Sequence, residues 1–473
     1  MTKDMRLPKW MHGIMLQYVP FADAASHELP LGRLMRLALF QLSVGMTMAL
    51  LVGTLNRVMI LELHVPAWWV ALSVALPLVF APLRAMIGYR SDTHPSALGL
   101  RRLPYMWIGT IYMFAGLAVM PFALMGLSEP REGYEWVIRI GAAMAFVCVG
   151  AGMQITQTAG LALASDISPK DKRPRVVALM YAMQLVGLIL GSAVLSYVLF
   201  DFSPLRLIQV VQGTAVAVVV LNITSLWKQE ARGSKRGERA PDGFANQWRG
   251  LIAMPRMRRF LWTVGLGSIA FSMQDIVLEP YGGQVLGLNV GLTSGLTALS
   301  AAGALIAFAW SARILAQGMD ACRLAAIGAL LGLPAFACVI FSAPLNSPLL
   351  FQTGAALIGF AGGSFSVGML LHAMSLTDET QTGMVLGAWG AVQATAAGLA
   401  MALGGVIRDL AGSLAEQGLL GEALNSPVTG YSMVFHIEMF MLFAVLIALG
   451  PLVTRGRRPD NDDNRFGLAE LPS

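Results

Sequence analysis

Long, continuous apolar runs alternate with short polar loops along this chain, and this pattern constrains its fold more than any other feature. Hydrophobic residues make up 56% of the 473 residues and charged residues only 13%, and the mean hydropathy is +0.64. These values lie well outside those of ordinary soluble domains. Outer-membrane barrels alternate apolar and polar residues, whereas these runs are continuous. The sequence therefore predicts an all-α integral membrane protein.

Twelve of these runs are long enough to cross a bilayer of about 30 Å, which takes about 20 helical residues. We predict two six-helix halves with spans at Leu34–Leu63, Ala67–Tyr89, Pro104–Leu127, Trp136–Ala164, Val176–Phe200 and Leu205–Trp227, then at Phe260–Tyr281, Leu292–Ala316, Arg323–Ser342, Leu349–Ser375, Gly383–Ile407 and Tyr431–Val453. The predicted organisation is an N-terminal tail (1–33), a first bundle (34–227), a basic linker (228–259), a second bundle (260–453) and a C-terminal tail (454–473). Within the first tail, residues 10–19 fit either a short interfacial helix or an ordered tail with scattered aromatic side chains.

Lys and Arg are concentrated in both tails, in the linker and in the loops after the second and fourth spans. Because positive residues favour the cytoplasmic side, we expect a multi-pass protein of the bacterial inner membrane with both termini in the cytoplasm. The net charge of +6 is then explained by topology, so we expect no nucleic-acid partner.

The loop between the second and third spans contains a recognisable pattern. Gly88, Asp92, Arg101 and Arg102 resemble the loop signature of the major facilitator superfamily. Residues 40–45 also resemble residues 260–265, at corresponding places in the two halves, and parallel six-helix repeats are typical of that superfamily. We predict that these four residues, called the conformational loop below, act as a hinge or latch between helices.

Polar residues inside the predicted spans are functional candidates, because burying an ionisable group in a membrane is costly unless it is paired or hydrated. The candidates are Asn56, Arg57, Arg84, Asp275 and Glu279. Arg57 can snorkel to the outer surface, and Arg84 fits a loop anchor. Asp275 and Glu279 lie four residues apart, which predicts one helix face. They fit either the proton-coupling groups of a carrier or a structural pair with Arg57.

Two histidines lie on apolar spans, His372 and His436. A neutral imidazole can ligate the metal of a tetrapyrrole pigment, so both are possible pigment contacts. A lone histidine on an apolar face is more often simply hydrogen-bonded in place. The sequence contains no metal-site spacing, P-loop, nucleophile elbow or dinucleotide fingerprint, so we expect no enzyme and no metal centre.

Gly187 and Gly191, four residues apart, predict close helix packing.

Several segments resemble the bacteriochlorophyll delivery (PucC/LhaA) family of the major facilitator superfamily. The resemblance is carried by PFADAASHELPLGRLMRLALFQLSVGM (20–46), GTLNRVMILEL (53–63), VPAWWVALSVALPLVFAPLRAMIGYRSDTH (65–94), RRLPYMWIGT (101–110) and LASDISPKDKRPRVVALMYAMQLVG (163–187). The general arrangement of the chain resembles that of the family over nearly its whole length, and the resemblance is looser in the second half.

The resemblance implies an assembly factor for a light-harvesting antenna in the intracytoplasmic photosynthetic membrane, with the core antenna slightly favoured over the peripheral one. It implies antenna alpha and beta polypeptides as partners, with the reaction centre or pigment-synthesis enzymes as further candidates. Bacteriochlorophyll, bound or delivered, and carotenoid are the implied cofactors. The alternative function is a proton-coupled secondary transporter of a small amphiphilic molecule, with Asp275 and Glu279 as its coupling groups.

Overall fold

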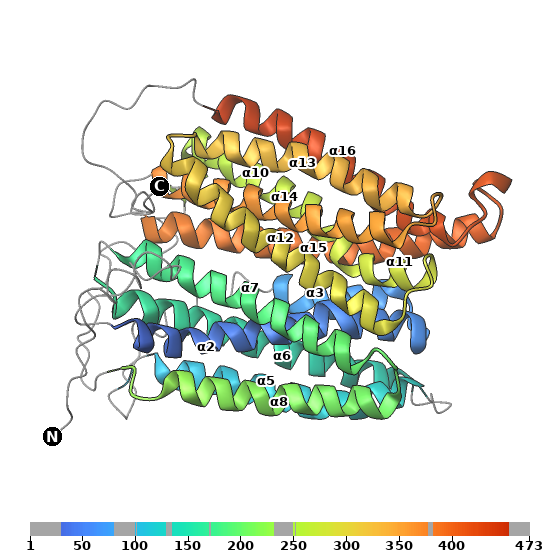
Figure 1. The fold of residues 1–473 in the computed structure, drawn as a ribbon, viewed down its shortest axis with the longest axis horizontal. Helices are drawn as coiled ribbons and strands as arrows, with labels where there is room; N and C mark the ends of the chain where they lie inside the picture. The colour runs from blue at the N-terminus through green and yellow to red at the C-terminus, as the bar shows by residue number, and fades with distance from the viewer. Residues whose placement is uncertain are drawn as a thin grey trace.

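Long helices lie side by side along the whole length of the molecule (Figure 1). The computed structural model describes residues 30–79, 100, 102–128, 135–169, 172–230, 249–250, 252–376 and 382–453. Its long helices in the first half are α2 (Leu31–Met48), α3 (Ala67–Val79), α5 (Leu103–Ser128), α6 (Glu135–Asp166), α7 (Arg173–Val198) and α8 (Pro204–Leu226). The second half contains α10 (Pro255–Ser272), α11 (Leu278–Gln284), α12 (Val290–Ala316), α13 (Ala321–Ser342), α14 (Pro348–Ser375), α15 (Thr382–Glu416) and α16 (Val428–Leu449).

The described residues form eleven helices that are long and apolar enough to cross a membrane, together with a shorter apolar helix at Ala67–Leu76. The prediction of a helical membrane bundle is confirmed. The second predicted span is described only as far as Val79, and residues 10–19, 231–248 and 454–473 lie outside the described part. The eleventh span was predicted to end at Ile407, but α15 continues to Glu416.

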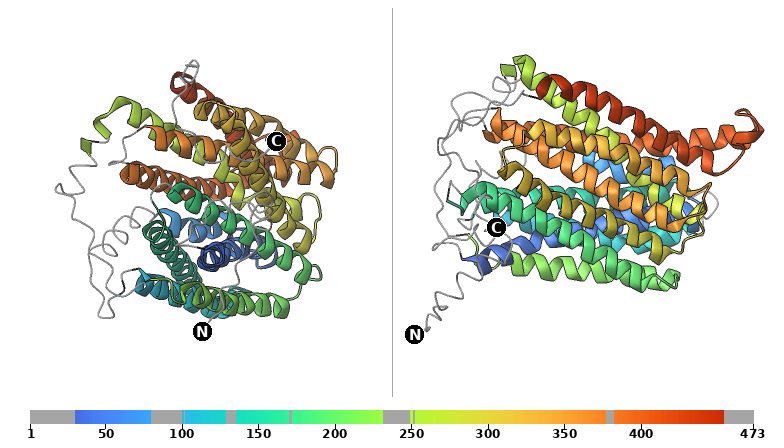
Figure 2. Two further views of the ribbon diagram at one scale, coloured as in Figure 1. Left: turned by 60° about the vertical axis from the view of Figure 1, so that its left-hand side comes forward. Right: turned by 45° about the horizontal axis from the view of Figure 1, so that its top comes forward.

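The helices of each half pack mainly against one another. In the first half α2 packs on α7 and α8, and α5 on α6 and α8, while in the second half α14 packs on α12 and α13, and α16 on α10 and α13. The halves meet along two helix pairs, α3 with α15 and α7 with α12. Figures 1 and 2 show the first six helices grouped on one side and the later helices on the other.

The first and seventh spans both depart from regular α-helix. After α2 the first span continues as two π-helical segments, Ala49–Leu55 and Val58–Glu62. The seventh span breaks into a 3₁₀ turn, Met273–Ile276, between α10 and α11. The two irregular segments contact each other. Such departures are common at functional sites and leave backbone groups that need other partners, so this meeting point is a natural place for a site.

Glycine lets α2 and α7 approach closely. A Cβ atom on Gly187 would lie 2.3 Å from the Leu42 carbonyl oxygen, and one on Gly191 would lie 2.9 Å from Cα of Met46. From the α2 side, a Cβ on Gly45 would lie 2.1 Å from the Gln184 carbonyl oxygen. The close packing predicted for Gly187 and Gly191 is confirmed.

Replacing Gly45 with alanine should therefore destabilise the protein by about 1–3 kcal/mol or more, because the neighbouring backbone cannot move away freely. The matched control is Gly213→Ala on α8, where an added methyl group meets no atom within 4 Å. The measurement is the melting temperature of each purified variant, monitored by tryptophan fluorescence. Equal melting temperatures would show that the helices separate without penalty.

Candidate functional site

Asn56 joins the two irregular spans. Its side chain is fully buried, and Nδ2 donates hydrogen bonds to the Ile276 carbonyl at 2.8 Å and to the Asp275 carbonyl at 3.3 Å. Both carbonyls belong to the region of the 3₁₀ turn, where regular helical hydrogen bonding stops. The side-chain amide of Asn56, in the first half, thus provides hydrogen bonds to backbone carbonyls at the break in the second half.

Arg57 is buried beside it, with 6% of its side chain exposed. Nη1 forms an ion pair with Glu62 at 3.0 Å, and Nη2 donates to the Leu288 carbonyl at 3.2 Å. Arg57 is therefore buried instead of reaching the surface, and its ion-pair partner is Glu62, while its charge also acts on Glu279. The π-helical geometry explains the pairing, because its hydrogen bonds join residues five apart, as Arg57 and Glu62 are.

Glu279 on α11 is buried against the first span, with 3% of its surface exposed. Its Oε1 accepts a hydrogen bond from the Thr297 hydroxyl at 2.5 Å, while Oε2 has no partner among the described atoms. Gly53 lies directly against this carboxyl group, since a Cβ there would be 2.6 Å from Oε1. The π-helical segment of the first span therefore makes room for Glu279.

Asp275 lies in the 3₁₀ turn and not on α11, so it does not form one continuous helix with Glu279. Its Oδ1 accepts from Nε2 of Gln274. The backbone N–H of Gln274 in turn donates to Glu438 on α16 at 2.6 Å. The prediction of a shared helix face assumed a regular helix and is corrected by this break.

Glu438 is fully buried and was not among the predicted site residues. An acidic residue within an apolar run is the sequence signal that could have identified it.

In the conformational loop, Gly88, Asp92 and Arg101 lie outside the described residues, as does Arg84. Arg102 is buried, and its Nε pairs with Asp166 at the end of α6 at 3.1 Å. Glu230 accepts the backbone N–H groups of Arg102 and Leu103, both at 3.1 Å. A carboxylate at a helix N-terminus is favourable. Glu230 therefore joins the start of α5 to the segment that follows α8, while Arg102 joins it to the end of α6.

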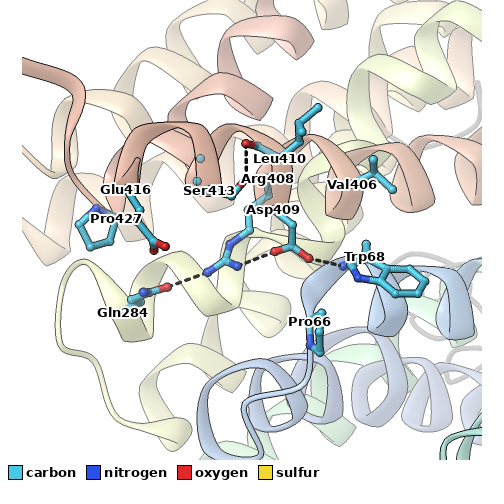
Figure 3. Close-up of a pocket in the computed structure, with 12 residues that line it drawn as sticks. Pro66, Trp68, Gln284, Val406, Arg408, Asp409, Leu410, Ser413, Glu416 and Pro427 are labelled. Atoms are coloured by element: carbon cyan, nitrogen blue, oxygen red, sulfur yellow. Dashed lines mark hydrogen bonds and ion pairs between the residues drawn. The ribbon is translucent and has the colours of Figure 1, made fainter. Parts of the chain in front are cut away.

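A pocket of about 580 Å³ lies at the end of the bundle where α3 begins and α15 ends (Figure 3). Asp409 accepts the backbone N–H of Trp68, at the start of α3, at 2.8 Å. Arg408 donates to Asp409 at 2.6 Å, to Gln284 at 2.9 Å and to the Tyr431 hydroxyl at 3.0 Å. These five residues, called the outer network below, connect the two halves at this end. The predicted eleventh span stopped before Arg408, so the sequence did not suggest this network.

The two histidines have different surroundings. His372 is half-buried on α14, its ring lies 5.7 Å from that of Phe260, and its Nε2 is buried without a partner among the described atoms. His436 is exposed on α16, where its Nδ1 lies 2.7 Å from the Ser432 carbonyl oxygen. A carbonyl oxygen only accepts, so Nδ1 carries a proton, and in the neutral imidazole Nε2 keeps a lone pair. The described part of the chain contains no group of three or more His, Cys, Asp or Glu that could hold a metal ion.

Comparison with solved structures identifies the fold. A bacterial homologue of the iron transporter ferroportin in an inward-facing state superposes with a TM-score of 0.66 at 14% identity, covering 89% of this chain and 98% of that one. At this identity the likeness concerns the fold alone, which this chain shares with that transporter homologue.

Comparison with protein sequences identifies the family. The model of the PUCC protein family matches residues 54–457. A Rhodobacter capsulatus protein described as an uncharacterized protein in the puhA-bchM intergenic region is 49% identical, covering 97% of this chain and 98% of that protein. Protein PucC of Rhodovulum sulfidophilum is 51% identical, covering 77% of this chain and 82% of its own. This multi-pass membrane protein therefore belongs to the PUCC family.

Proposed function

We propose that this protein is an assembly factor for a bacterial light-harvesting antenna, which binds bacteriochlorophyll and antenna polypeptides on its lipid-facing surface. Membership of the PUCC family supports a role in the photosynthetic antenna. The client is the core antenna, and the site of action is the intracytoplasmic photosynthetic membrane. The alpha and beta antenna polypeptides are its partners, with the reaction centre or pigment-synthesis enzymes as neighbours in assembly.

His436 is the observation that carries this proposal. Ionisable residues within membrane spans almost always face the protein interior or a water-filled cavity, yet His436 is exposed nine residues into the apolar helix α16. Met433, Phe440 and Ile447 are also exposed, at 50%, 68% and 75%. Their spacing of three, four and seven residues places them with His436 along one side of the helix. An imidazole thus stands within an apolar, partly aromatic strip that faces lipid.

The chemistry of this strip fits a magnesium tetrapyrrole. The Nδ1–H of His436 is held by the Ser432 carbonyl, as a second hydrogen bond commonly orients metal-ligating histidines. Nε2 is then available to ligate the central metal of the pigment. The bound tetrapyrrole would supply the light-absorbing group. The apolar side chains on either side would contact the macrocycle, and an elongated carotenoid could lie along the same strip.

The orientation of the chain is consistent with this function. The start of α2 and the end of α16 lie at the same end of the bundle (Figure 1), as an even number of crossings requires. The excess of Lys and Arg in both tails and in the linker supports a cytoplasmic location for that end. The outer network then lies on the opposite, periplasmic side.

Gentle purification of the full chain from photosynthetic membranes tests the proposal. We expect the absorption spectrum to show bacteriochlorophyll, and mass spectrometry to find antenna alpha and beta polypeptides in the same fraction. A preparation free of both pigment and antenna chains, with uptake of a soluble substrate in vesicles, would refute the assembly function.

A secondary transporter is the second candidate, and the interrupted first and seventh spans are the observation that favours it. Transporters of several folds bind substrates and coupling ions at discontinuous helices. Here Glu279 lies buried at such a meeting point with one carboxylate oxygen unpaired. A carrier of this kind must open and close the two ends of the bundle in turn, whereas an assembly factor can work as a fixed scaffold.

Cross-linking the periplasmic end distinguishes the two functions. Cysteines in place of Trp68 and Asp409, which are in contact in the native chain, can be joined by a short bifunctional thiol reagent after Cys148, Cys322 and Cys338 are replaced by alanine. We expect antenna assembly to continue after cross-linking, at the level of the two single-cysteine controls. Loss of assembly only in the cross-linked protein would show that the function requires alternating access.

A further inference from the structure

A second group of polar side chains lies where the seventh span breaks and meets α16. It consists of Gln274 and Asp275 in the 3₁₀ turn and Glu438 on α16, and it is called the break cluster below. Gln274 is at its centre, because its backbone N–H donates to Glu438 Oε1 and its side-chain Nε2 donates to Asp275 Oδ1. The Asp275 carboxylate also acts electrostatically on Glu438. The three side chains therefore lie close together, with Gln274 and Glu438 buried and Asp275 partly exposed.

Two oxygen atoms of the break cluster have no hydrogen-bond partner among the described atoms. They are Oε1 of Gln274 and Oε2 of Glu438, on side chains that are 5% and 0% exposed. The carboxamide of Gln274 is fixed within the cluster by its bond to Asp275, so its free oxygen lies there too. A buried acceptor without a partner costs about 1–3 kcal/mol, which is reason to look for a ligand that these oxygens bind.

The charge of the break cluster points to a cation. It brings two carboxyl groups together, and a carboxyl group in an apolar interior either stays protonated or binds a partner of opposite charge. The arginines on the neighbouring first and eleventh spans do not supply it, because Arg57 is paired with Glu62 and Arg408 with Asp409. The cluster thus offers oxygen ligands and negative charge without a protein cation bound to it in the described structure.

We infer that the break cluster is a binding site for Na⁺. Carboxylate and amide oxygens are hard donors that suit small hard cations. Backbone carbonyl groups beside the 3₁₀ turn can complete the shell of a small monovalent ion, as unwound helices do in other membrane proteins.

Bound Na⁺ would tie the break of the seventh span to α16. Glu438 lies two residues after His436 on α16, but His436 is exposed and Glu438 is fully buried. The break cluster and the lipid-facing strip therefore lie on different sides of one helix.

The test is thermal melting of the purified full-length protein at fixed pH and ionic strength in NaCl, KCl or choline chloride. We expect NaCl to raise the melting temperature by several degrees in a saturable way, because a ligand that binds only the folded state stabilises it. KCl should do so much less. The purified protein should also bind ²²Na⁺ with a stoichiometry near one.

Glu438→Gln and Asp275→Asn keep the side-chain shapes and should abolish both the Na⁺-dependent shift and ²²Na⁺ binding. Glu416→Gln at the exposed end of α15 is the matched control and should retain both. If either cluster variant fails to fold, competition of unlabelled Na⁺ and K⁺ for ²²Na⁺ on the native protein still decides the matter. Identical melting in all three salts together with no ²²Na⁺ binding, or unchanged binding in Glu438→Gln, would overturn the inference.

Discussion

Replacing His436 with leucine should remove most of the bacteriochlorophyll that purifies with the protein. Leucine keeps the apolar strip of α16 intact but offers no lone pair to the metal. Losing only a hydrogen-bond partner of a metal ligand costs about 10–100-fold in affinity, so loss of the ligand itself should lower bound pigment at least about tenfold. The measurement is the ratio of pigment absorbance to protein in matched preparations.

Two further variants make this test specific. Met433→Leu changes an exposed neighbour on the same strip and should leave bound pigment nearly unchanged. The His372→Leu variant tests whether the half-buried histidine on α14 binds the pigment instead. Full pigment content in the His436 variant would contradict the assignment, and a loss confined to the His372 variant would move the pigment site to α14.

Replacing Arg408 with leucine should destabilise the protein more than any other single change in the outer network. Its guanidinium donates to Asp409, Gln284 and Tyr431 and stacks 4.7 Å from the centre of the Tyr431 ring. Removing one partner of a buried ion pair costs about 3–5 kcal/mol. The two side chains here are 21% and 20% exposed, so solvent screening lowers our expectation to about 2 kcal/mol.

A double-mutant cycle separates the ion pair from the rest of the network. Asp409→Leu removes the same pair together with the hydrogen bond to the Trp68 backbone, and the double variant should lose less than the sum of the single effects. Arg313→Leu, on the exposed side of α12, is the control for removing a surface arginine. Melting temperatures that add within error would show that Arg408 and Asp409 act separately.

The sequence predicts the helical class and most span positions because the bilayer imposes a length and an apolar composition on every crossing. It does not predict where the helices become irregular. The π-helical segments of the first span and the 3₁₀ turn at Met273–Ile276 depend on contacts between the two halves. For this reason the spacing of Asp275 and Glu279 suggested a shared face, and the ion pair of Arg57 with Glu62 was not expected.

The missed residues have two different causes. Glu438 could have been found, because it stands alone in an apolar run and the rule applied to Asp275 and Glu279 covers it equally. Arg408 and Asp409 could not be found in the same way, since they follow the apolar part of the eleventh span. Only the structure shows that α15 continues past them and turns them toward α3 and α11.

The absorption bands of the antenna in a strain that lacks this protein test the central claim most directly. Such a strain, compared with the same strain carrying the gene in trans, should lose most of its core antenna band and keep its peripheral band. Pigment synthesis should continue, so the loss can be assigned to assembly. A deletion strain with both antenna bands at their normal heights would contradict the claim that this protein is an antenna assembly factor.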